Sequence, residues 1–353
     1  MSGVHLTVHA RSDVGRVRTN NEDAFLVSDL ETGARLDLPA LQVDVGERGI
    51  LLVLSDGMGG HAAGEVASAL VVESLRRSLS EPAADHSSLQ RLINGAVHRA
   101  NAEVKEAARA ADKHGMGATL TAMLVHDRDA FVAEVGDSRG YLLRAGRLRQ
   151  ITRDQSFVQA LVDAGVLSRE QAKVSSQKNV VLQAMGRDDD VQAAIGRLSL
   201  RRGDRLLLCC DGISNVVHEA ELTSLLGDPA TACDRMIALA NERGGADNLT
   251  AVVAHVEGDG LPLPADEERV TQTLEVLQEY GGLPSARAAE PTPAAEPTPA
   301  AEPAPAVEPD PPALAAADPA PEAGEGGSSR AWWIAALVAA LGLAALLVSR
   351  LLS

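Results

Sequence analysis

The feature that most constrains the fold is a series of short apolar runs separated by only brief polar turns. The clearest case is TLTAMLVHDRDAFVAEV, in which the polar HDRD divides the runs Thr119–His126 and Ala130–Val135. Two apolar runs this close together favour a β-hairpin, and therefore an antiparallel sheet. Further strands are expected at Leu6–His9, Ala24–Ser28, Ile50–Leu54, Gly140–Leu143, Arg205–Cys210 and Leu249–Val256.

Helical periodicity appears in three segments, Gly64–Leu79, Leu89–Ala111 and Ala230–Glu242. Hairpin strands together with separate helices predict an α+β domain built in layers. Between Ser156 and Gly186 the pattern weakens to a short helix, a turn at Gly165 and a polar stretch. We interpret this segment as a mobile flap on the surface of the domain.

The composition changes sharply after residue 256. Residues 257–330 contain 15 acidic and three basic residues, a net charge of −12, and 12 of the chain's 17 prolines fall within residues 281–330. Such a segment cannot bury an apolar core, so residues 257–330 are expected to form an acidic, disordered linker. Within it, Leu261–Tyr280 carries a short amphipathic pattern that is compatible with a weak helix.

The last segment is strongly apolar. Residues 331–348 form an uncharged run of 18 residues. As a helix at roughly 1.5 Å per residue it would reach about 27 Å, enough to cross a bilayer core. Trp332 and Trp333 stand at one boundary, where interfacial aromatic residues are common. The run predicts a transmembrane tail anchor, and a helix that drives self-association is the alternative.

Charge and cysteine content narrow the compartment and the partners. The formal net charge of −17 argues against a nucleic-acid-binding protein. The three cysteines, two of them adjacent, are too few for a disulfide framework and fit a reducing cytosol. The N-terminus lacks the basic and apolar regions of a secretory signal. We therefore expect a cytoplasmic membrane location, with residues 1–256 on the cytoplasmic side.

Five aspartates share one sequence context: each stands at the end of an apolar strand, beside glycine or just before a strand. They are Asp23, Asp56, Asp137, Asp211 and Asp247. A single Asp–Gly pair is most often a turn, but carboxylates that converge on one edge repel each other unless a cation lies between them. Oxygen ligands with few His or Cys partners favour magnesium, manganese or calcium. The wide spacing does not fit a single calcium-binding loop, so the pattern suits metal-assisted hydrolysis.

The segments SDVGRVRTNNEDAF, LSDGMGGHAAGEVAS, MGATL, VGDSRGYLLR, CDGIS and GGADNLTAVV follow in this order within residues 5–256. Together they resemble the bacterial branch of the metal-dependent protein phosphatases of the 2C type. The resemblance implies a four-layer α-β-β-α fold, an antiparallel β-sandwich flanked by helix pairs. It implies hydrolysis of phosphoserine and phosphothreonine in proteins by a monomeric catalytic domain. The implied partners are phosphorylated proteins, membrane-associated Ser/Thr kinases and their targets.

The resemblance also implies two Mn²⁺ or Mg²⁺ ions and the residues that hold them. Asp56 would bridge the two ions, and the Gly57 carbonyl would bind one of them. Asp211 and Asp247 would complete the other. The reaction implied is direct attack of a metal-activated water on phosphorus, without a phosphoenzyme.

Further residues take supporting roles by the same resemblance. Glu22 and Asp23 would hold metal-bound waters, and Asp137, together with one of the main ligands, matches the position of a weaker third ion. Asn248 would orient the aspartate that precedes it. Arg18, which on spacing alone would be a surface arginine, matches the position that binds the substrate phosphate.

Two positions depart from the family pattern. Met58 stands where the animal enzymes have a histidine proposed as general acid, so the leaving group must be protonated by another group. Gln155 stands where relatives often have histidine before the flap, which alters the contacts of the flap. Two other functions stay open: a metal-binding pseudophosphatase that acts as a tethered binding module, and a phosphatase of a small phosphometabolite.

Overall fold

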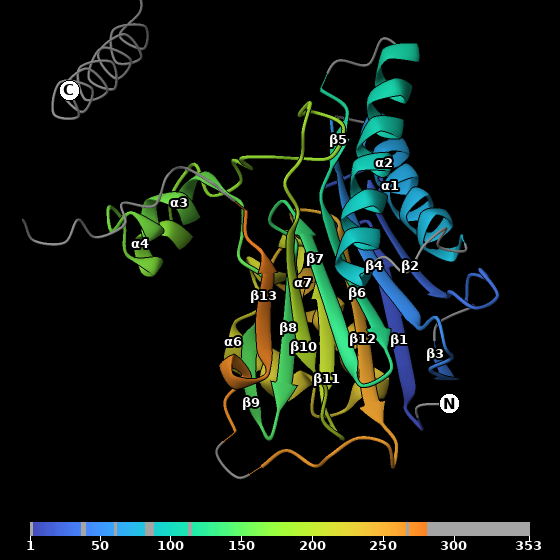
Figure 1. Cartoon of the computed structure of the whole chain (residues 1–353). Coiled ribbons are helices and arrows are strands. Elements are labelled where there is room, and N and C mark those ends of the chain that lie inside the picture. The colour runs from blue at the N-terminus through green and yellow to red at the C-terminus, as the bar shows by residue number, and fades with distance from the viewer. Residues whose placement is uncertain are drawn as a thin grey trace, which may run out of the picture. The chain divides into compact units, whose positions relative to one another are not determined.

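Two antiparallel sheets stacked on each other form the centre of the domain (Figure 1). The structure is a computed structural model that describes residues 3–36, 40–59, 62–81, 88–111, 115–265 and 268–280. The first sheet has the order β3-β1-β12-β11-β8-β9 and consists of β1 (His5–Asp13), β3 (Ala40–Asp44), β8 (Arg139–Arg144), β9 (Arg147–Gln150), β11 (Arg205–Cys209) and β12 (Leu249–Glu257). The second has the order β13-β10-β7-β6-β4-β2, with β5 paired to β4, and consists of β2 (Asp23–Asp29), β4 (Ile50–Met58), β5 (Gly117–Ala118), β6 (Leu120–His126), β7 (Asp129–Val135), β10 (Ala194–Ser199) and β13 (Leu274–Gln278).

Helices cover the outer faces of both sheets. The long helices α1 (Ala62–Ser80) and α2 (Leu89–Ala110) pack on the second sheet, whereas α7 (Pro229–Glu242) packs on β1 and β12 of the first (Figure 1). The shorter helices are α3 (Phe157–Asp163), α4 (Arg169–Lys173), α5 (Asp211–Ser214), α6 (Glu219–Leu225) and the 3₁₀ turn η1 (Val270–Gln272). The expected α+β fold with antiparallel sheets is confirmed.

Strand β4 explains why the layers stack in this way. Successive side chains of a strand point to opposite faces. Ile50, Leu52 and Leu54 lie in the core between the two sheets, whereas Leu51 and Val53 lie in the core beneath α1 and α2. The continuous apolar run of β4 is therefore buried on both faces, which is why it shows no alternation with polar residues.

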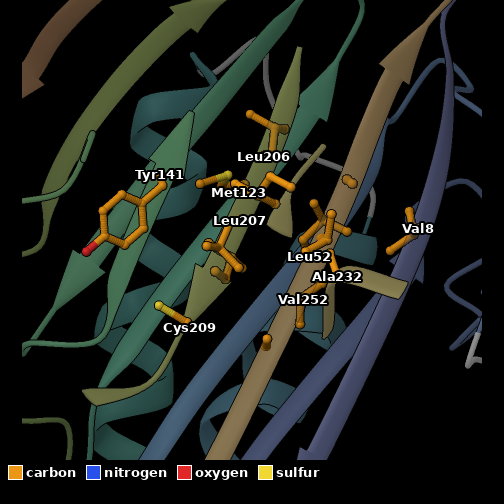
Figure 2. Close-up of a cluster of buried hydrophobic side chains, with 14 of the residues drawn as sticks. Val8, Leu52, Met123, Tyr141, Leu206, Leu207, Cys209, Ala232 and Val252 are labelled. Carbon is orange, nitrogen blue, oxygen red and sulfur yellow. The ribbon is translucent and has the colours of Figure 1, made fainter. Parts of the chain in front are cut away.

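The core between the sheets contains side chains from both sheets, and side chains of α6 and α7 belong to the same apolar cluster. Figure 2 shows Leu52 of β4 and Met123 of β6 close to Leu206 of β11, all of them buried. Cys209 belongs to the same cluster, and all three cysteines are buried free thiols. The interpretation of the cysteines as core residues is thus confirmed.

The segment between residues 156 and 186 leaves the sandwich and returns to nearly the same place. It contains α3 and α4, with a turn at Gly165 where φ is +70°. Ser156 forms a bridge with Val181, and the Phe157 N–H donates to the Val180 carbonyl at 2.8 Å. The short helix and the turn expected here are both present.

The prediction for residues 257–280 was wrong. This part of the chain is not linker, because β13 extends the second sheet by pairing with β10. Nor does a helix span Leu261–Tyr280: only the turn η1 precedes the strand. β13 is an edge strand of only five residues, LEVLQ, and Glu275 interrupts its apolar residues, so its pattern is weak. The remaining linker, residues 281–330, and the predicted transmembrane span 331–348 lie outside the described residues. Within the part of the chain that the structure describes, no helix has the length and hydropathy needed to cross a membrane.

Candidate metal centre

Asp23 and Asp56 face each other across two neighbouring strands. They are Cα partners in the antiparallel pair β2–β4, and residues paired in this way project their side chains on the same face of the sheet. The Asp56 N–H donates to Thr119 Oγ1 at 2.9 Å, and the Thr119 N–H donates to the Asp56 carbonyl at 2.8 Å. The strand that carries Asp56 is therefore fixed on both sides.

The other three aspartates come from the same edge of the sandwich. Asp137 lies in the turn between β7 and β8, Asp211 begins α5 directly after β11, and Asp247 stands two residues before β12. Because β8, β11 and β12 are antiparallel neighbours, the end of β11 lies beside the starts of the other two strands. The sequence prediction that strand ends bring these residues together agrees with this topology.

The carboxylates act on one another electrostatically. Burial, followed by the charges of Asp23, Asp211, Asp137 and Asp247, raises the pKa of Asp56 well above its ordinary value. Burial also raises the pKa of Asp23 to about 7, that of Asp137 to about 8 and that of Asp211 to about 6, with neighbouring aspartates adding to each shift. A cluster in which every carboxylate disfavours the charge of the next one is suited to a cation.

Asp23 supplies a direct sign that a ligand is expected. Its Oδ2 accepts a hydrogen bond from Thr250 at 2.6 Å, whereas its buried Oδ1 has no hydrogen-bond partner among the residues that the structure describes. The donor set is all oxygen, which fits hard divalent cations such as Mg²⁺ and Mn²⁺. As the side chains stand, no three His, Cys, Asp or Glu residues of the described chain form a closed metal site. The fit to a metal thus rests on the orphaned oxygen, the donor chemistry and the shared electrostatics.

Gly57 and Glu22 occupy a tightly packed corner beside Asp56. A Cβ on Gly57 would lie 2.2 Å from the Gly64 carbonyl oxygen and 2.5 Å from that of Glu22. The Gly57 N–H donates to the Glu22 carbonyl at 3.1 Å. A Cβ on Gly64 would lie 2.3 Å from Glu22 Oε2, which places the Glu22 carboxylate over the start of α1. Only glycine allows the backbone to approach so closely here.

Arg18 is brought to the cluster from a loop far away in sequence. Its Nη2 donates to Asp247 Oδ2 at 3.0 Å, and its side chain is 51% exposed. Burial lowers the pKa of Arg18, but the carboxylates of Asp247, Glu22 and Asp56 outweigh it, and the net direction is upward. A half-exposed guanidinium next to the carboxylates is accessible to an incoming anion.

Asn248 positions the loop that carries Arg18. Its Nδ2 donates to the carbonyls of Val14 and Asn20, at 3.0 and 2.9 Å, and its Oδ1 accepts from the Glu22 N–H at 2.8 Å. The orientation of Asp247 expected from Asn248 comes from its backbone, whose N–H donates to Asp247 Oδ1 at 2.9 Å. The side chain itself joins residues 14–22 to the start of β12.

Sequence analysis missed two polar residues at this edge. The guanidinium of Arg139 donates to both oxygens of Asp154, at 2.9 and 2.6 Å, and its charge partly opposes the rise that burial causes in the pKa of Asp137 and of Asp211. The Thr250 hydroxyl donates a hydrogen bond to the Asp23 carboxylate. Both stand two or three residues beyond a predicted ligand, in VGDSR and ADNLT, and this spacing was the only available signal.

Gln155, the departure noted before the flap, is a buried anchor. Its Oε1 accepts from the Gly136 N–H at 2.8 Å and from Gln183 Nε2 at 2.7 Å, and its Nε2 donates to the Glu134 carbonyl at 3.2 Å. Glutamine therefore ties both ends of the 156–186 segment to the end of β7, next to Asp137.

The sequence of this chain is similar to that of known protein phosphatases. A family model described as protein phosphatase 2C matches residues 37–254. The serine/threonine protein phosphatase PstP of Mycobacterium tuberculosis is 41% identical over 251 residues, which is 70% of this chain and 44% of that protein. The serine/threonine phosphatase stp of Listeria monocytogenes is 33% identical over 249 residues, 69% of this chain and 93% of that protein. The chain thus spans less than half the length of the PstP relatives.

Solved structures agree with the sequence matches. The crystal structure of M. tuberculosis PstP/Ppp has a TM-score of 0.61 at 38% identity and covers 72% of this chain and 99% of that one. A structure of the PstP catalytic domain in complex with two manganese ions has a TM-score of 0.60 at 39% identity, with the same coverage.

Proposed function

Because the chain belongs to the protein phosphatase 2C family, we propose that it hydrolyses phosphoserine and phosphothreonine in proteins with the help of divalent metal ions. The observation that carries the proposal is the convergence of five aspartates from the ends of both sheets, with a guanidinium beside them. Oxygen ligands next to a phosphate-binding cation are what metal-assisted phosphoester hydrolysis requires.

The ligand assignment follows the resemblance to the family. Asp56, whose pKa is raised by burial and by all four other aspartates, would hold the Mn²⁺ or Mg²⁺ ions together with the Gly57 carbonyl, Asp211 and Asp247. Two manganese ions in the PstP catalytic domain support this number.

Supporting roles fall to residues around this set. Glu22 and Asp23 would hold metal-bound waters, and Asp137, in the turn between β7 and β8, would take part in a third, weaker site. Asn248 fixes the loop of Arg18. Its three side-chain hydrogen bonds support that role.

The reaction needs no covalent intermediate on the protein. When bound, the metal ions supply an activated water and offset the charge of the phosphoryl oxygens. Arg18 orients the phosphate through its planar pair of N–H donors. Burial raises the pKa of Cys209 to about 12, so its thiol stays protonated and is no nucleophile. Met58 has no proton to give, which leaves protonation of the leaving group to other donors.

The proposal extends to location and partners. The apolar run 331–348 supports a membrane tail anchor, and the buried free cysteines are consistent with a reducing cytoplasm for the catalytic domain. A phosphatase held there meets phosphoproteins made by membrane-associated Ser/Thr kinases at raised effective concentration. Fractionation of the full chain and of a chain that ends at residue 330 tests the anchor: only the full chain is expected in the membrane fraction.

The activity is tested by phosphate release from a phosphothreonine peptide with chelator, with Mg²⁺ and with Mn²⁺. We expect turnover only with metal, and a loss of at least about 100-fold in Asp211→Asn, because a ligand is removed. Asp234→Asn is the matched control, since Asp234 pairs with Arg11 on the exposed face of α7.

Each other outcome selects a different function. Turnover in the presence of chelator would contradict the metal site. No phosphate release from a folded chain would favour the tethered binding module. Faster hydrolysis of a small phosphometabolite than of the peptide would favour the metabolite phosphatase.

A further inference from the structure

A second arginine, outside the set assigned above, stands at the rim of the site. Arg187 Nη1 lies 3.8 Å from the Sδ of Met58, which follows Asp56 by two residues on β4. The stem of Arg187 crosses Gly117, where a Cβ would come within 2.9 Å of Arg187 Cγ. Gly117 is itself the strand partner of Met58. The guanidinium is therefore held against the end of β4, the strand that carries Asp56 and Gly57.

The turn that carries Arg187 is anchored on two sides. Met185 and Ala118 exchange backbone hydrogen bonds of 2.8 and 3.0 Å, which join the turn to β5. Asn101 of α2, only 3% exposed, accepts from the Gly186 N–H at 2.6 Å and donates to the Asp188 carbonyl at 3.1 Å. A side chain on so rigid a turn loses little conformational freedom when it binds a ligand.

The acidic residues next to Arg187 are already engaged. The carboxylate of Asp188 accepts from a backbone N–H of its own turn at 3.0 Å, and the two that follow pair with side chains of α2: Asp189 with Lys105 and Asp190 with His98. Within the described residues Arg187 has no carboxylate partner, and it is exposed. An exposed guanidinium without an internal partner is suited to an external carboxylate or phosphate, which its fork contacts with two hydrogen bonds.

We propose that Arg187 binds an anionic group of the substrate close to the phosphorylated residue, either a carboxylate or a second phosphate, and so gives a preference for such substrates. This inference rests on the proposed function, because it assigns a specificity residue to the same site. An extended peptide advances about 3.3–3.6 Å per residue. Asp56 and Met58 are two positions apart on β4, roughly 7 Å along a strand, so a side chain one to three residues from the phosphorylated one has the length to reach a guanidinium beside Met58. Arg18 remains for the reacting phosphate.

The test uses the full chain and three phosphothreonine peptides that differ at one position two residues away. That position carries alanine, glutamate or a non-hydrolysable phosphonate. In Arg187→Ala we expect the ratio of kcat/KM between the glutamate and alanine peptides to fall about three- to tenfold, mainly through KM. Arg187→Glu is expected to invert the ratio. The matched control is Arg149→Ala, an exposed arginine on β9, which is expected to keep it.

The phosphonate peptide separates the two anions, since a larger ratio for phosphonate than for glutamate would identify a second phosphate as the better ligand. An unchanged ratio in Arg187→Ala would overturn the inference. So would an equal loss on all three peptides, which would assign Arg187 to the fold or to the reaction itself.

Binding of the same peptides, followed by fluorescence anisotropy, distinguishes this inference from the proposed function. If the chain binds the glutamate peptide more tightly than the alanine peptide, and Arg187→Ala does not, the inference holds even where no phosphate is released. Equal affinity for the two peptides in the unsubstituted chain would refute it, whatever the turnover.

Discussion

Arg144 connects segments of the domain that lie far apart in the sequence. Its side chain and that of Asp204 are 2% and 1% exposed, and two hydrogen bonds of 2.8 and 2.6 Å join them. The same guanidinium donates to the Ser199 carbonyl at 2.9 Å and to Thr273 Oγ1 at 2.7 Å. Glu268 Oε2 lies farther away, at 3.4 Å from Arg144 Nη1. A buried guanidinium that loses its closely bonded carboxylate keeps the cost of burial without most of the compensating attraction.

Asp204→Asn is therefore expected to lower the free energy of unfolding by about 3–5 kcal/mol, as measured by urea denaturation. The control is Asp259→Asn, because Asp259 forms an exposed pair with Arg202 and exposed pairs contribute little. Equal denaturation midpoints for the two variants would mean that Arg144 finds another partner once Asp204 is neutral.

Residues of the candidate site differ in how far the sequence alone identifies them. The five aspartates could be named because strand ends and glycines next to them are visible locally. Thr250 and Arg187 could not, because their roles arise from contacts with Asp23 and Met58, which are 227 and 129 positions away. The metal-binding roles of the aspartates stay predictions until a metal is bound and tested.

At the scale of elements, Glu221 joins the beginning of α6 to the end of α7. It accepts from the His218 N–H at 3.0 Å and from both terminal nitrogens of Arg243, at 2.8 and 2.6 Å. The Arg243 hydrogen bond is the main cause that lowers the pKa of Glu221 to about 2. A carboxyl group whose pKa is lower in the folded state stabilises that state only while it is ionised.

Glu221→Gln should therefore lower the melting temperature at neutral pH. The difference from the unsubstituted chain should be full above the unfolded pKa of about 4.3 and vanish as the pH falls through about 2, where Glu221 is protonated in both states. Melting curves of the two chains between pH 2 and 7 measure it. A difference that grows toward low pH would contradict the assignment.

Strand β13 is expected to stabilise the domain. Gln278 of β13 donates to the Ala193 carbonyl at 2.9 Å, and Gln90 of α2 donates to the Leu277 carbonyl at 3.0 Å. A chain that ends at residue 256 loses these bonds together with the Thr273 partner of Arg144. Its melting temperature is expected to lie at least roughly 5 °C below that of a chain that ends at residue 280. Equal melting temperatures would show that β13 is dispensable.

The elements that could be predicted are those with apolar cores. All eight expected strands and all three expected helices are present, because burial on at least one face leaves a regular pattern. Strands β3, β5, β9, β10 and β13 were missed, and among them β9 and β13 are edge strands with the sequences RLRQ and LEVLQ. None of the residues of β9 and β13 is fully buried, so pairing with a neighbouring strand, rather than an apolar pattern of their own, makes them strands.

At the scale of the whole molecule, the carboxylate cluster joins the two sheets at one edge. Asp23 and Asp56 belong to the second sheet, whereas Asp211 and Asp247 lie at strand ends of the first. Electrostatic repulsion among these carboxylates opposes folding, and a cation bound between them offsets that repulsion. Removal of metal should thus weaken the whole fold as well as the reaction.

We expect Mn²⁺ at about 100 times its dissociation constant to stabilise the folded chain by about 2.7 kcal/mol, and chelator to reverse the effect. Calorimetry with and without metal measures it. Asp211→Asn should lose most of the gain, whereas Asp234→Asn should keep it. A melting temperature that metal leaves unchanged would contradict the site.

The segment between residues 156 and 181 begins and ends at one point of the sandwich, because the Leu182 N–H donates to the Gln155 carbonyl at 2.8 Å and Ser156 pairs with Val181. An excursion closed at its base can change in length or composition without shifting the register of any strand, since the entropy of closing a loop varies slowly with its length. All five aspartates of the carboxylate cluster lie outside this excursion, so its sequence can be exchanged as one module without moving them.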